Sequence, residues 1–338
     1  MYSSSLLVST LALALSAVPA VQSRHAPGLH PHRHLAPRET YPQWCLKDGY
    51  TGKDVFNYFN FFTGPDPTNG FVEYVDKETA EKEGLVKTIG DAAYFGVDSD
   101  TVLTGPSASQ KLRRQQSVGR KSIRVQGIKT IDEGLVIVDV AHMPGAACGT
   151  WPALWTMGEG EWPKNGEIDI VEGINLNSAN RMVLHTEAKC DISNADATGT
   201  LINPQCAVSA GTEGCAVEDQ RPTSFGTGFN ANGGGVYALL WTDDAIKMWF
   251  FPRGSVPSSI TEKMPHPEEF GPPAANFEGD CDIPSAFGAQ RLILNTDFCG
   301  DWAGNAWEAS GCPMTPGLDQ IYSCVKYVAE NPLAFKES

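Results

Sequence analysis

Residues 165–173 read NGEIDIVEG, and this stretch decides the fold class of the chain. In an extended strand, side chains alternate between the two faces with a period of two. Glu167 and Asp169 therefore share one face, while Ile168 and Ile170 share the other. One acidic face and one apolar face favour a β-strand that is buried on one side only.

The third acid of this stretch, Glu172, joins the acidic face only if the strand contains a β-bulge. Strict alternation places Val171 beside the acids, so one extra residue must be accommodated before Glu172 rejoins them. Gly173 makes such a distortion easier. A helix does not meet the requirement, because at about 100° per residue Glu167 and Glu172 would lie about 140° apart. The stretch predicts a strand with three carboxylates on one face.

The rest of the chain has the same β-rich character. Gly 34 and Pro 23 are abundant, short β-prone runs recur between turn signals, and long helical periodicity is absent. The runs lie at residues 122–125, 135–140, 167–171, 183–186, 236–242, 247–251 and 291–296. They predict an all-β fold of two packed antiparallel sheets with short helices. A sheet of this size usually bends, and its concave face then offers an open cleft.

Composition narrows the class of partner. The chain has 338 residues, of which 41% are hydrophobic, so it can bury a core. It carries 25 Lys and Arg against 40 Asp and Glu, a net charge of -15. This acidic balance argues against binding to nucleic acids or anionic membrane surfaces. We expect a monomer whose partner is uncharged.

The N-terminal segment is expected to be a targeting signal. Residues 6–20, LLVSTLALALSAVPA, form a short apolar run that ends in small residues, which predicts a signal peptide over 1–20 and secretion to the extracellular space. Residues 21–40 hold four histidines and lack an apolar pattern, which favours a pro-segment or linker, with metal binding as the alternative. One domain is then expected over 41–338.

Nine cysteines follow residue 40. In a secreted protein they are expected to form disulfides. No CxxC spacing occurs, which counts against a zinc site. The pairing is not determined by sequence, but Cys206 and Cys215 would close a short loop and are the pair that we predict.

Three crowded carboxylates suit acid–base chemistry on a neutral substrate. Their mutual repulsion raises at least one pKa, and glycoside hydrolysis uses one ionised and one protonated carboxyl. A separation of about 5–5.5 Å gives retention of configuration and about 6.5–9.5 Å gives inversion, which the sequence leaves open. Calcium or magnesium binding and a solvated face are the alternatives. Three tryptophans directly upstream, Trp151, Trp155 and Trp162, argue against the solvated face.

The stretch from Trp151 to Gly173 resembles glycoside hydrolase family 16, and is most similar to the fungal secreted endo-1,3(4)-β-glucanases, or laminarinases. The family signature is E-I-D-I-x-E, present here in its bulged form. The resemblance covers the chain from about residue 41 onward and includes residues 62–72, 120–124, 219–226 and 295–304. It implies a β-jelly-roll sandwich of two curved antiparallel sheets with an open substrate cleft.

The resemblance also implies roles for the acids. Glu167 corresponds to the nucleophile, Asp169 to its assistant, and Glu172 to the general acid and then base of a retaining double displacement. No cofactor and no metal are implied. Sugar rings pack their CH-rich faces on indoles, so aromatic residues near the acids are candidates for substrate binding. The candidate substrate-binding residues are Trp155, Trp162, His185, Trp302, Trp307 and Arg124.

For some of these candidates, a purely structural role is the alternative. Trp302 follows Gly300 and Asp301 in a Gly-rich loop, whereas Trp307 is a weaker candidate because a large ring is most often core. Arg124 is as well explained as a solvated strand arginine. Trp241 and Trp249 lie in alternating strands and are expected in the core.

The predicted function is hydrolysis of internal β-1,3 and possibly β-1,4 bonds in β-glucans such as laminarin. One alternative is a β-glucan transglycosylase that uses the same three acids and passes the glycosyl unit to a sugar. The other is a non-catalytic glucan-binding module, against which the complete set of acids argues.

Overall fold

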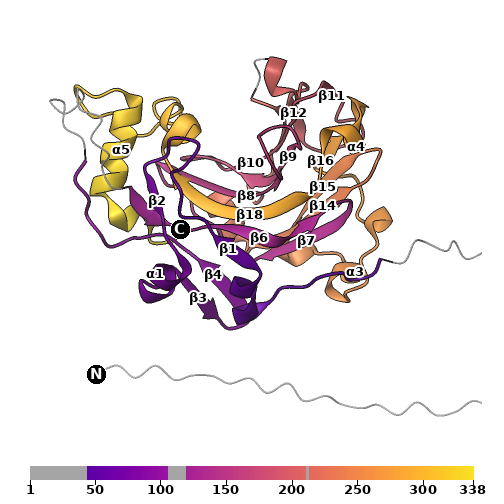
Figure 1. The fold of residues 1–338 in the computed structure, drawn as a ribbon, viewed down its shortest axis with the longest axis horizontal. Helices are drawn as coiled ribbons and strands as arrows, with labels where there is room; N and C mark the ends of the chain where they lie inside the picture. The colour runs from indigo at the N-terminus through magenta and orange to yellow at the C-terminus, as the bar shows by residue number, and fades with distance from the viewer. Residues whose placement is uncertain (1–43, 106–118, 211–212) are drawn as a thin grey trace, which may run out of the picture. The chain divides into compact units, whose positions relative to one another are not determined.

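The strand that carries the three acids, β9 (Glu167–Glu172), lies inside a large antiparallel sheet. The structure is a computed structural model, which describes residues 44–105, 119–210 and 213–338. Eight strands form this sheet in the order β1 (Phe59–Phe61), β6 (Arg124–Ile131), β18 (Gln290–Phe298), β8 (Thr150–Gly158), β9, β10 (Asn180–His185), β13 (Cys215–Asp219) and β12 (Thr200–Asn203). The acids therefore lie near the middle of the sheet, flanked by β8 and β10 (Figure 1).

A second antiparallel sheet of four strands covers the apolar face of the first. Its order is β16 (Ala275–Phe277), β15 (Ile246–Pro252), β14 (Gly235–Trp241) and β7 (Gly134–Val140). One continuous core lies between the sheets, in which Ile168 and Leu184 of the large sheet share a cluster with Tyr237 and Phe250 of the small one. The expected all-β sandwich of two antiparallel sheets is confirmed, because alternation in each strand supplies one apolar face to this core.

The central strand β8 was missing from the expected strands. It alternates regularly between half-buried and buried residues from Thr150 to Gly158, but it contains Pro152. Proline lacks a backbone N–H and is normally confined to sheet edges. Pairing between β8 and β9 ends at Ala153, so Pro152 is paired with β18 alone and behaves locally as an edge residue.

The remaining elements are short and cover the ends of the sandwich. Three two-stranded sheets pair β2 (Val72–Tyr74) with β5 (Arg120–Ser122), β3 (Val86–Ile89) with β4 (Ala92–Phe95), and β11 (Cys190–Ile192) with β17 (Gly279–Cys281). The α-helices are α1 (Lys77–Lys82), α2 (Gly226–Ala231), α3 (Ser258–Thr261), α4 (Ile283–Ala286) and α5 (Gln320–Glu330). Single 3-10 turns occupy Gly52–Asn57, Val208–Ala210, Arg253–Ser255, Pro267–Glu269 and Pro332–Phe335, and a π-helical turn occupies Gly300–Gly304.

Four disulfides are present among the described residues. The predicted pair Cys206–Cys215 is confirmed, and it closes a loop at the start of β13. The other three pairs are Cys148–Cys312, Cys190–Cys281 and Cys299–Cys324. The ninth cysteine, Cys45, is exposed. The expectation of a disulfide-bonded protein is thus confirmed, whereas most of the pairing required the fold.

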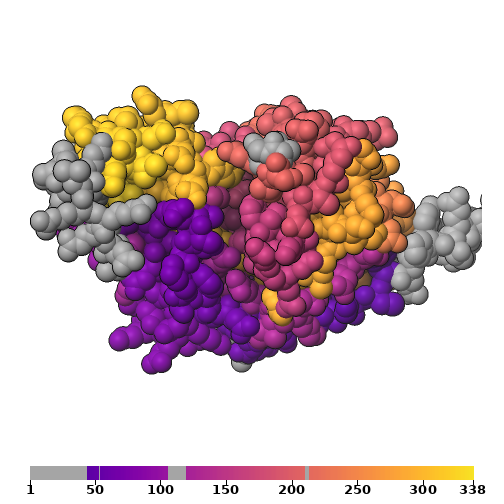
Figure 2. Space-filling view, turned by 45° about the horizontal axis from the view of Figure 1, so that its top comes forward, coloured from indigo at the N-terminus to yellow at the C-terminus, as the bar shows by residue number. Residues whose placement is uncertain are grey.

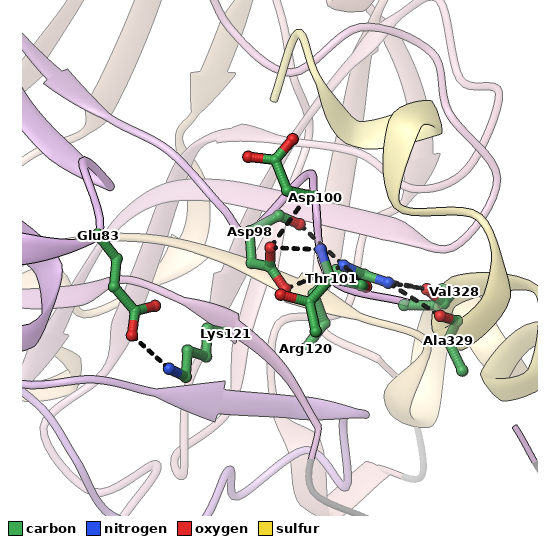
Figure 3. Close-up of polar contacts among 8 residues, drawn as sticks. All are labelled: Glu83, Asp98, Asp100, Thr101, Arg120, Lys121, Val328 and Ala329. Carbon is green, nitrogen blue, oxygen red and sulfur yellow. Dashed lines mark hydrogen bonds and ion pairs between the residues drawn. The ribbon is translucent and has the colours of Figure 1, made fainter. Parts of the chain in front are cut away.

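A fully buried arginine ties the C-terminal helix to the body. The Arg120 guanidinium donates to the backbone oxygens of Val328 and Ala329 near the end of α5, over 2.6 to 3.2 Å. It also donates to the backbone oxygens of Asp98 and Thr101 and forms a 3.3 Å ion pair with the Asp98 carboxylate. Figure 3 shows these groups converging on one side chain. The buried charge is therefore surrounded by acceptors, as a buried cation requires.

The predictions for the N-terminus lie outside the described residues. These are the signal peptide over 1–20, the pro-segment or linker over 21–40 and the first residues of the domain that begins at 41. Among the described residues, no helix is both long enough and apolar enough to cross a membrane.

Candidate active site

The predicted β-bulge is present in β9 and brings the third acid to the other two. Asp169 pairs with Trp155 of β8, but the next pair along the strands joins Val171 to Leu154, so Ile170 is the extra residue. Ile170 and Val171 both enter the core between the sheets. As a result, Glu172 returns to the same face as Glu167 and Asp169, opposite Ala153.

His185 of β10 completes the cluster of acids. It is the cross-strand partner of Glu167. Its Nε2 lies 3.3 Å from Oδ2 of Asp169 and 3.8 Å from Oε1 of Glu167. The Asp169 side chain is only 3% exposed, and the neighbouring Glu167 lowers its pKa against the larger effect of burial. The expectation that His185 lies in the cleft beside the acids agrees with this arrangement.

Burial raises the pKa of all three acids. Burial is the largest cause in each case, and it raises the pKa of Glu167, Asp169 and Glu172 to about 8 each. The charge of Asp169 raises the pKa of both glutamates further. Because the three groups titrate together, their protons belong to the cluster rather than to single residues. A cluster of this kind holds at least one proton near neutral pH, which is what a general acid needs.

Two tryptophans donate to the two glutamates separately. Trp162 Nε1 donates to Oε2 of Glu167 over 2.6 Å, and Trp151 Nε1 donates to Oε1 of Glu172 over 2.7 Å. Both hydrogen bonds lower the pKa of the acceptor and so oppose the effect of burial. The glutamates therefore have different partners although they lie on one strand.

An aromatic and cationic group lies on the β6 side of the acids. Trp155 donates from Nε1 to Oδ1 of Asn295 over 2.7 Å. The Arg124 guanidinium stacks between the rings of Trp155 and Phe62, at 5.0 and 4.9 Å from their centroids. Arg124 is only 5% exposed, so the alternative of a solvated strand arginine is wrong. Its Nε has no hydrogen-bond partner among the described residues.

A second aromatic group lies next to Glu172. Trp302, in the π-helical turn, meets Trp151 edge-to-face with 5.6 Å between ring centroids. The Arg181 guanidinium lies 5.3 Å from the Trp302 centroid. Trp302 is half-buried and contacts the ring that binds Glu172, so the structure brings it to the site as expected.

Trp307 does not lie in the site, and the prediction for it is wrong. It is 0% exposed and belongs to a core cluster beneath α5. Its Nε1 donates to the backbone oxygen of Pro313, and its ring packs on Tyr327. An indole suits a core as well as a sugar face, so composition alone does not separate Trp307 from Trp302. Trp241 and Trp249 are buried, as expected.

One face of the molecule is hollowed. Figure 2 shows a hollow between the indigo and yellow segments on one side and the magenta to salmon segments on the other. Along β8, the half-buried residues that alternate with core residues include Trp151 and Trp155. Trp162, from the loop before β9, is 47% exposed although its N–H is bound to Glu167. Its ring edge and face are therefore open to a ligand.

The same cluster includes a set of donor atoms that could hold a metal ion. One atom each of Glu167, Asp169 and His185 lie within 4.8 Å of one another. Two carboxylates and one imidazole are fewer oxygens than the six to eight that calcium takes. These are also the atoms that proton transfer within the cluster would use.

Sequence reasoning missed three residues of the site. Trp151 is not among the predicted substrate-binding residues, although its four-residue offset from Trp155 in one strand places both on the same face. Asn295 and Phe62 come from parts of the chain more than 80 residues from the acids, and although both stand in stretches that carry the family resemblance, nothing in the sequence places them beside Trp155 and Arg124. Only the strand order brings β18 and the segment after β1 to β8.

Comparisons with known proteins agree with the fold. Residues 59–338 match the family described as XgeA-like, catalytic GH16 domain. A "Probable endo-1,3(4)-beta-glucanase" of Aspergillus niger is 50% identical over 87% of this chain and 38% of its own length. The endo-1,3(4)-β-glucanase xgeA of Emericella nidulans is 45% identical over 87% of this chain and 45% of its own length. The chain thus spans less than half the length of both curated relatives.

Two solved structures are also similar. An elongating GH family 16 β-1,3-glucosyltransferase has a TM-score of 0.80 and 49% identity, with 86% of this chain and 95% of that chain covered. Laminarinase 16A from Phanerochaete chrysosporium, solved with 6-O-glucosyl-laminaritriose in its donor and acceptor sites, has a TM-score of 0.78 and 40% identity over the same shares. These similarities confirm the predicted jelly-roll sandwich. The chain belongs to glycoside hydrolase family 16, and its residues 59–338 are an XgeA-like catalytic GH16 domain.

Proposed function

We propose that this protein is a secreted endo-β-glucanase that hydrolyses internal β-1,3, and also β-1,4, bonds of β-glucans with retention of configuration. The observation that carries the proposal is the gathering of Glu167, Asp169 and Glu172 on one face of β9, with separate indole donors on the two glutamates. The names of the relatives support the same substrate class.

In the first step, Glu167 acts as the nucleophile. Its carboxylate oxygen bonds to the anomeric carbon while the glycosidic C–O bond breaks, and Glu172 gives its proton to the leaving oxygen. The Trp162 N–H stabilises the ionised form of Glu167 before attack. Asp169 is nearly buried beside Glu167, and its charge raises the pKa of the nucleophile, so it adjusts the charge of Glu167 during the reaction.

In the second step, Glu172 acts as a base. It takes a proton from a water molecule whose oxygen attacks the same anomeric carbon, and the bond to Glu167 breaks. Two inversions give net retention. The Trp151 N–H stabilises Glu172 in the ionised form that this step requires. Glu172 carries both proton transfers, so the proposed reaction uses no metal and no cofactor.

The cleft residues have matching roles in this proposal. Trp162 and Trp302 offer partly open indole faces for the CH-rich faces of glucosyl rings. Trp155, Arg124 and His185 line the positions next to the acids, where the Arg124 guanidinium and the His185 imidazole bind sugar hydroxyls. Arg124 has an unpaired Nε among rings, which is a donor suited to a hydroxyl.

The test is an activity panel on β-1,3, mixed β-1,3/1,4 and β-1,4 glucans, with reducing ends and product lengths measured before and after dialysis against a chelator. We expect activity on laminarin, short internal fragments as products, and no effect of chelation. The variants Glu167→Gln and Glu172→Gln should lose activity, while Glu308→Gln, an exposed glutamate on the surface, serves as the control. Full activity of Glu167→Gln on laminarin would overturn the proposal.

Glycosyl transfer is the second candidate. It is favoured by the similarity to the elongating β-1,3-glucosyltransferase, at 49% identity. The first step is the same, but in the second step Glu172 takes the proton from a sugar hydroxyl instead of water, and the product chain grows. Mass spectrometry of products from a single oligosaccharide separates the candidates, because only transfer produces chains longer than the starting material.

Secretion and processing are part of the proposal. We place a signal peptide at 1–20, a pro-segment or linker at 21–40 and the catalytic domain at 41–338, acting as a monomer outside the cell. Four disulfides suit an oxidising compartment and support this placement. N-terminal sequencing of the protein recovered from culture medium is the test, and a start at Met1 or retention in the cytosol would contradict it.

A further inference from the structure

The bulge in β9 interrupts hydrogen bonding to the neighbouring strand. Regular pairing between β9 and β10 runs from Glu167 with His185 to Asp169 with Val183 and then stops. Three positions further along each strand, Glu172 would have faced Asn180. Because the bulge turns the chain at Ile170, the backbone groups on both sides of it no longer meet a ladder partner on β10.

The side chain of Asn180 replaces that missing ladder. Its Nδ2 donates to the backbone oxygen of Ile170 over 2.8 Å. Its Oδ1 accepts from the backbone N–H of Glu172 over 2.9 Å. One amide group therefore satisfies both the carbonyl of the extra residue, Ile170, and the N–H of Glu172 beyond the bulge. Groups of this kind are expensive to leave unpaired when they are buried.

Asn180 is itself held firmly. It is 1% exposed, and its backbone N–H donates to Ser224 Oγ over 3.0 Å. The Ser224 hydroxyl donates in turn to the backbone oxygen of Asp219, and the Tyr237 hydroxyl donates to the backbone oxygen of Ser224. The amide makes hydrogen bonds to both Ile170 and Glu172, so it cannot rotate without breaking them, while the bond to Ser224 holds its backbone. Asn180 thus connects Glu172 to the core between the two sheets.

We propose that Asn180 is a positioning residue for Glu172, which fixes the backbone of the acid/base relative to Glu167. Asn180 contacts the chain of Glu172 at its N–H and touches neither the other acids nor the cleft tryptophans by any hydrogen bond. The inference rests on the proposed function, because it concerns the step in which Glu172 transfers a proton. It predicts that loss of the amide affects proton transfer more than attack by Glu167.

Substrates whose leaving groups differ in acidity distinguish an effect on proton transfer by Glu172 from an effect on attack by Glu167. An internal glucan bond has a poor leaving group that needs the proton from Glu172. A 2,4-dinitrophenyl laminaribioside has a leaving group that departs without a proton, so its first step depends on Glu167 alone. A residue that only supports the fold would slow both substrates equally.

The experiment compares Asn180→Ala with a matched control, Asn276→Ala. Asn276 is also a buried amide that donates to a backbone oxygen, that of Ala195 over 2.9 Å, but it lies in β16 of the other sheet. We expect Asn180→Ala to reduce kcat on laminarin by about 100-fold, as for misplaced catalytic groups. Its burst of dinitrophenolate should stay close to that of the parent protein. Asn276→Ala should leave the ratio of the two rates unchanged.

A second variant covers the case in which Asn180→Ala does not fold. Asn180→Asp keeps the shape, and its protonated carboxyl can still donate to Ile170 and accept from Glu172, whereas its ionised form cannot donate. At low pH we expect the activity of this variant to approach that of the parent. As the pH rises, its activity should fall at a lower pH than the activity of the parent does.

The outcomes separate the inference from the function that it rests on. Equal losses on laminarin and on the dinitrophenyl substrate, or no loss on laminarin, would overturn the role of Asn180. An unchanged pH profile of Asn180→Asp would do the same. If instead Glu167→Gln and Glu172→Gln are active on laminarin, the proposed function itself fails, whatever Asn180→Ala does.

Discussion

Trp151 and Glu172 are joined by a hydrogen bond of 2.7 Å from the indole Nε1 to the carboxyl Oε1. A donor to a carboxylate stabilises its ionised form, and this bond lowers the pKa of Glu172 against the larger effect of burial. In Trp151→Phe, the pKa of Glu172 should therefore rise. If Glu172 is the general acid, it stays protonated to higher pH, and the alkaline limb of kcat/KM moves upward by about one unit. A pH profile on laminarin measures the shift.

The corresponding change at Glu167 should move the other limb. Trp162 Nε1 donates to Glu167 over 2.6 Å and lowers its pKa. In Trp162→Phe the pKa of Glu167 should rise. If Glu167 is the nucleophile, it is then protonated at higher pH, and the acidic limb of kcat/KM moves upward. Activity below neutral pH should fall accordingly. Movement of the same limb in both tryptophan variants would contradict the separate roles of the two glutamates.

Stability should also depend on pH through these acids. The folded-state pKa of Glu172 is about 8 against an ordinary value of 4.5, so the folded state binds the proton more tightly than the unfolded state. This contribution is fully present below about pH 4.5 and is lost as the pH rises towards 8. Gln does not titrate, so Glu172→Gln does not lose stability as the pH rises. Its Tm should therefore exceed that of the parent at pH 8.

A comparison at pH 5 completes this test. There the parent carboxyl is still protonated, and the gain in Tm for Glu172→Gln should be smaller than at pH 8. Glu308→Gln, at an exposed position, is the control and should show no pH-dependent gain. A gain that is equal at both pH values would rule out the titration of Glu172 as its cause.

The two C-terminal tryptophans should respond in opposite ways. Trp307 is fully buried beneath α5, so Trp307→Ala should lower the free energy of unfolding by about 3–5 kcal/mol. Its folded fraction should keep the parental kcat/KM on laminarin. Trp302 contacts Trp151 at the site, so Trp302→Ala should reduce kcat/KM with a smaller loss of stability. Denaturant titration and kinetics on both variants measure the contrast, and a reversed pattern would refute it.

Arg120 should be worth far more to stability than its neighbour Lys121. In Arg120→Met, the Asp98 carboxylate and the carbonyls of Val328 and Ala329 lose their buried partner (Figure 3), and such a break costs about 3–5 kcal/mol. Lys121 forms a partly exposed pair with Glu83, and Lys121→Met should cost less than about 1 kcal/mol. Guanidinium unfolding of both variants is the measurement, and similar midpoints would speak against the role of Arg120.

Much of the fold is legible in local patterns. Alternation in NGEIDIVEG predicts the half-buried strand, and the mismatch at Val171 predicts the bulge that the pairing of β8 with β9 contains. The seven β-prone runs all fall in observed strands or at their ends. These inferences succeed because a strand has a period of two whatever it pairs with.

Features that depend on the neighbouring strand could not be predicted from the sequence. The sequence does not predict β8, because Pro152 disfavours a central strand. The structure accommodates Pro152 because the pairing of β8 with β9 ends at Ala153. Trp302 and Trp307 have the same side chain five residues apart, yet one lies at the site and the other in a core, according to which elements cover them.

The sequence by itself determined the acidic strand, its bulge and the family, because these are written in adjacent residues. The tertiary structure decided which groups surround the acids. Trp151 of β8 donates to Glu172 of the neighbouring β9, and Asn180 of β10 donates to and accepts from the backbone at the bulge. The Arg124 guanidinium lies between the rings of Trp155 and Phe62. The physical reason is that burial and hydrogen bonding, which set the pKa and position of each acid, come from residues that only strand order brings together.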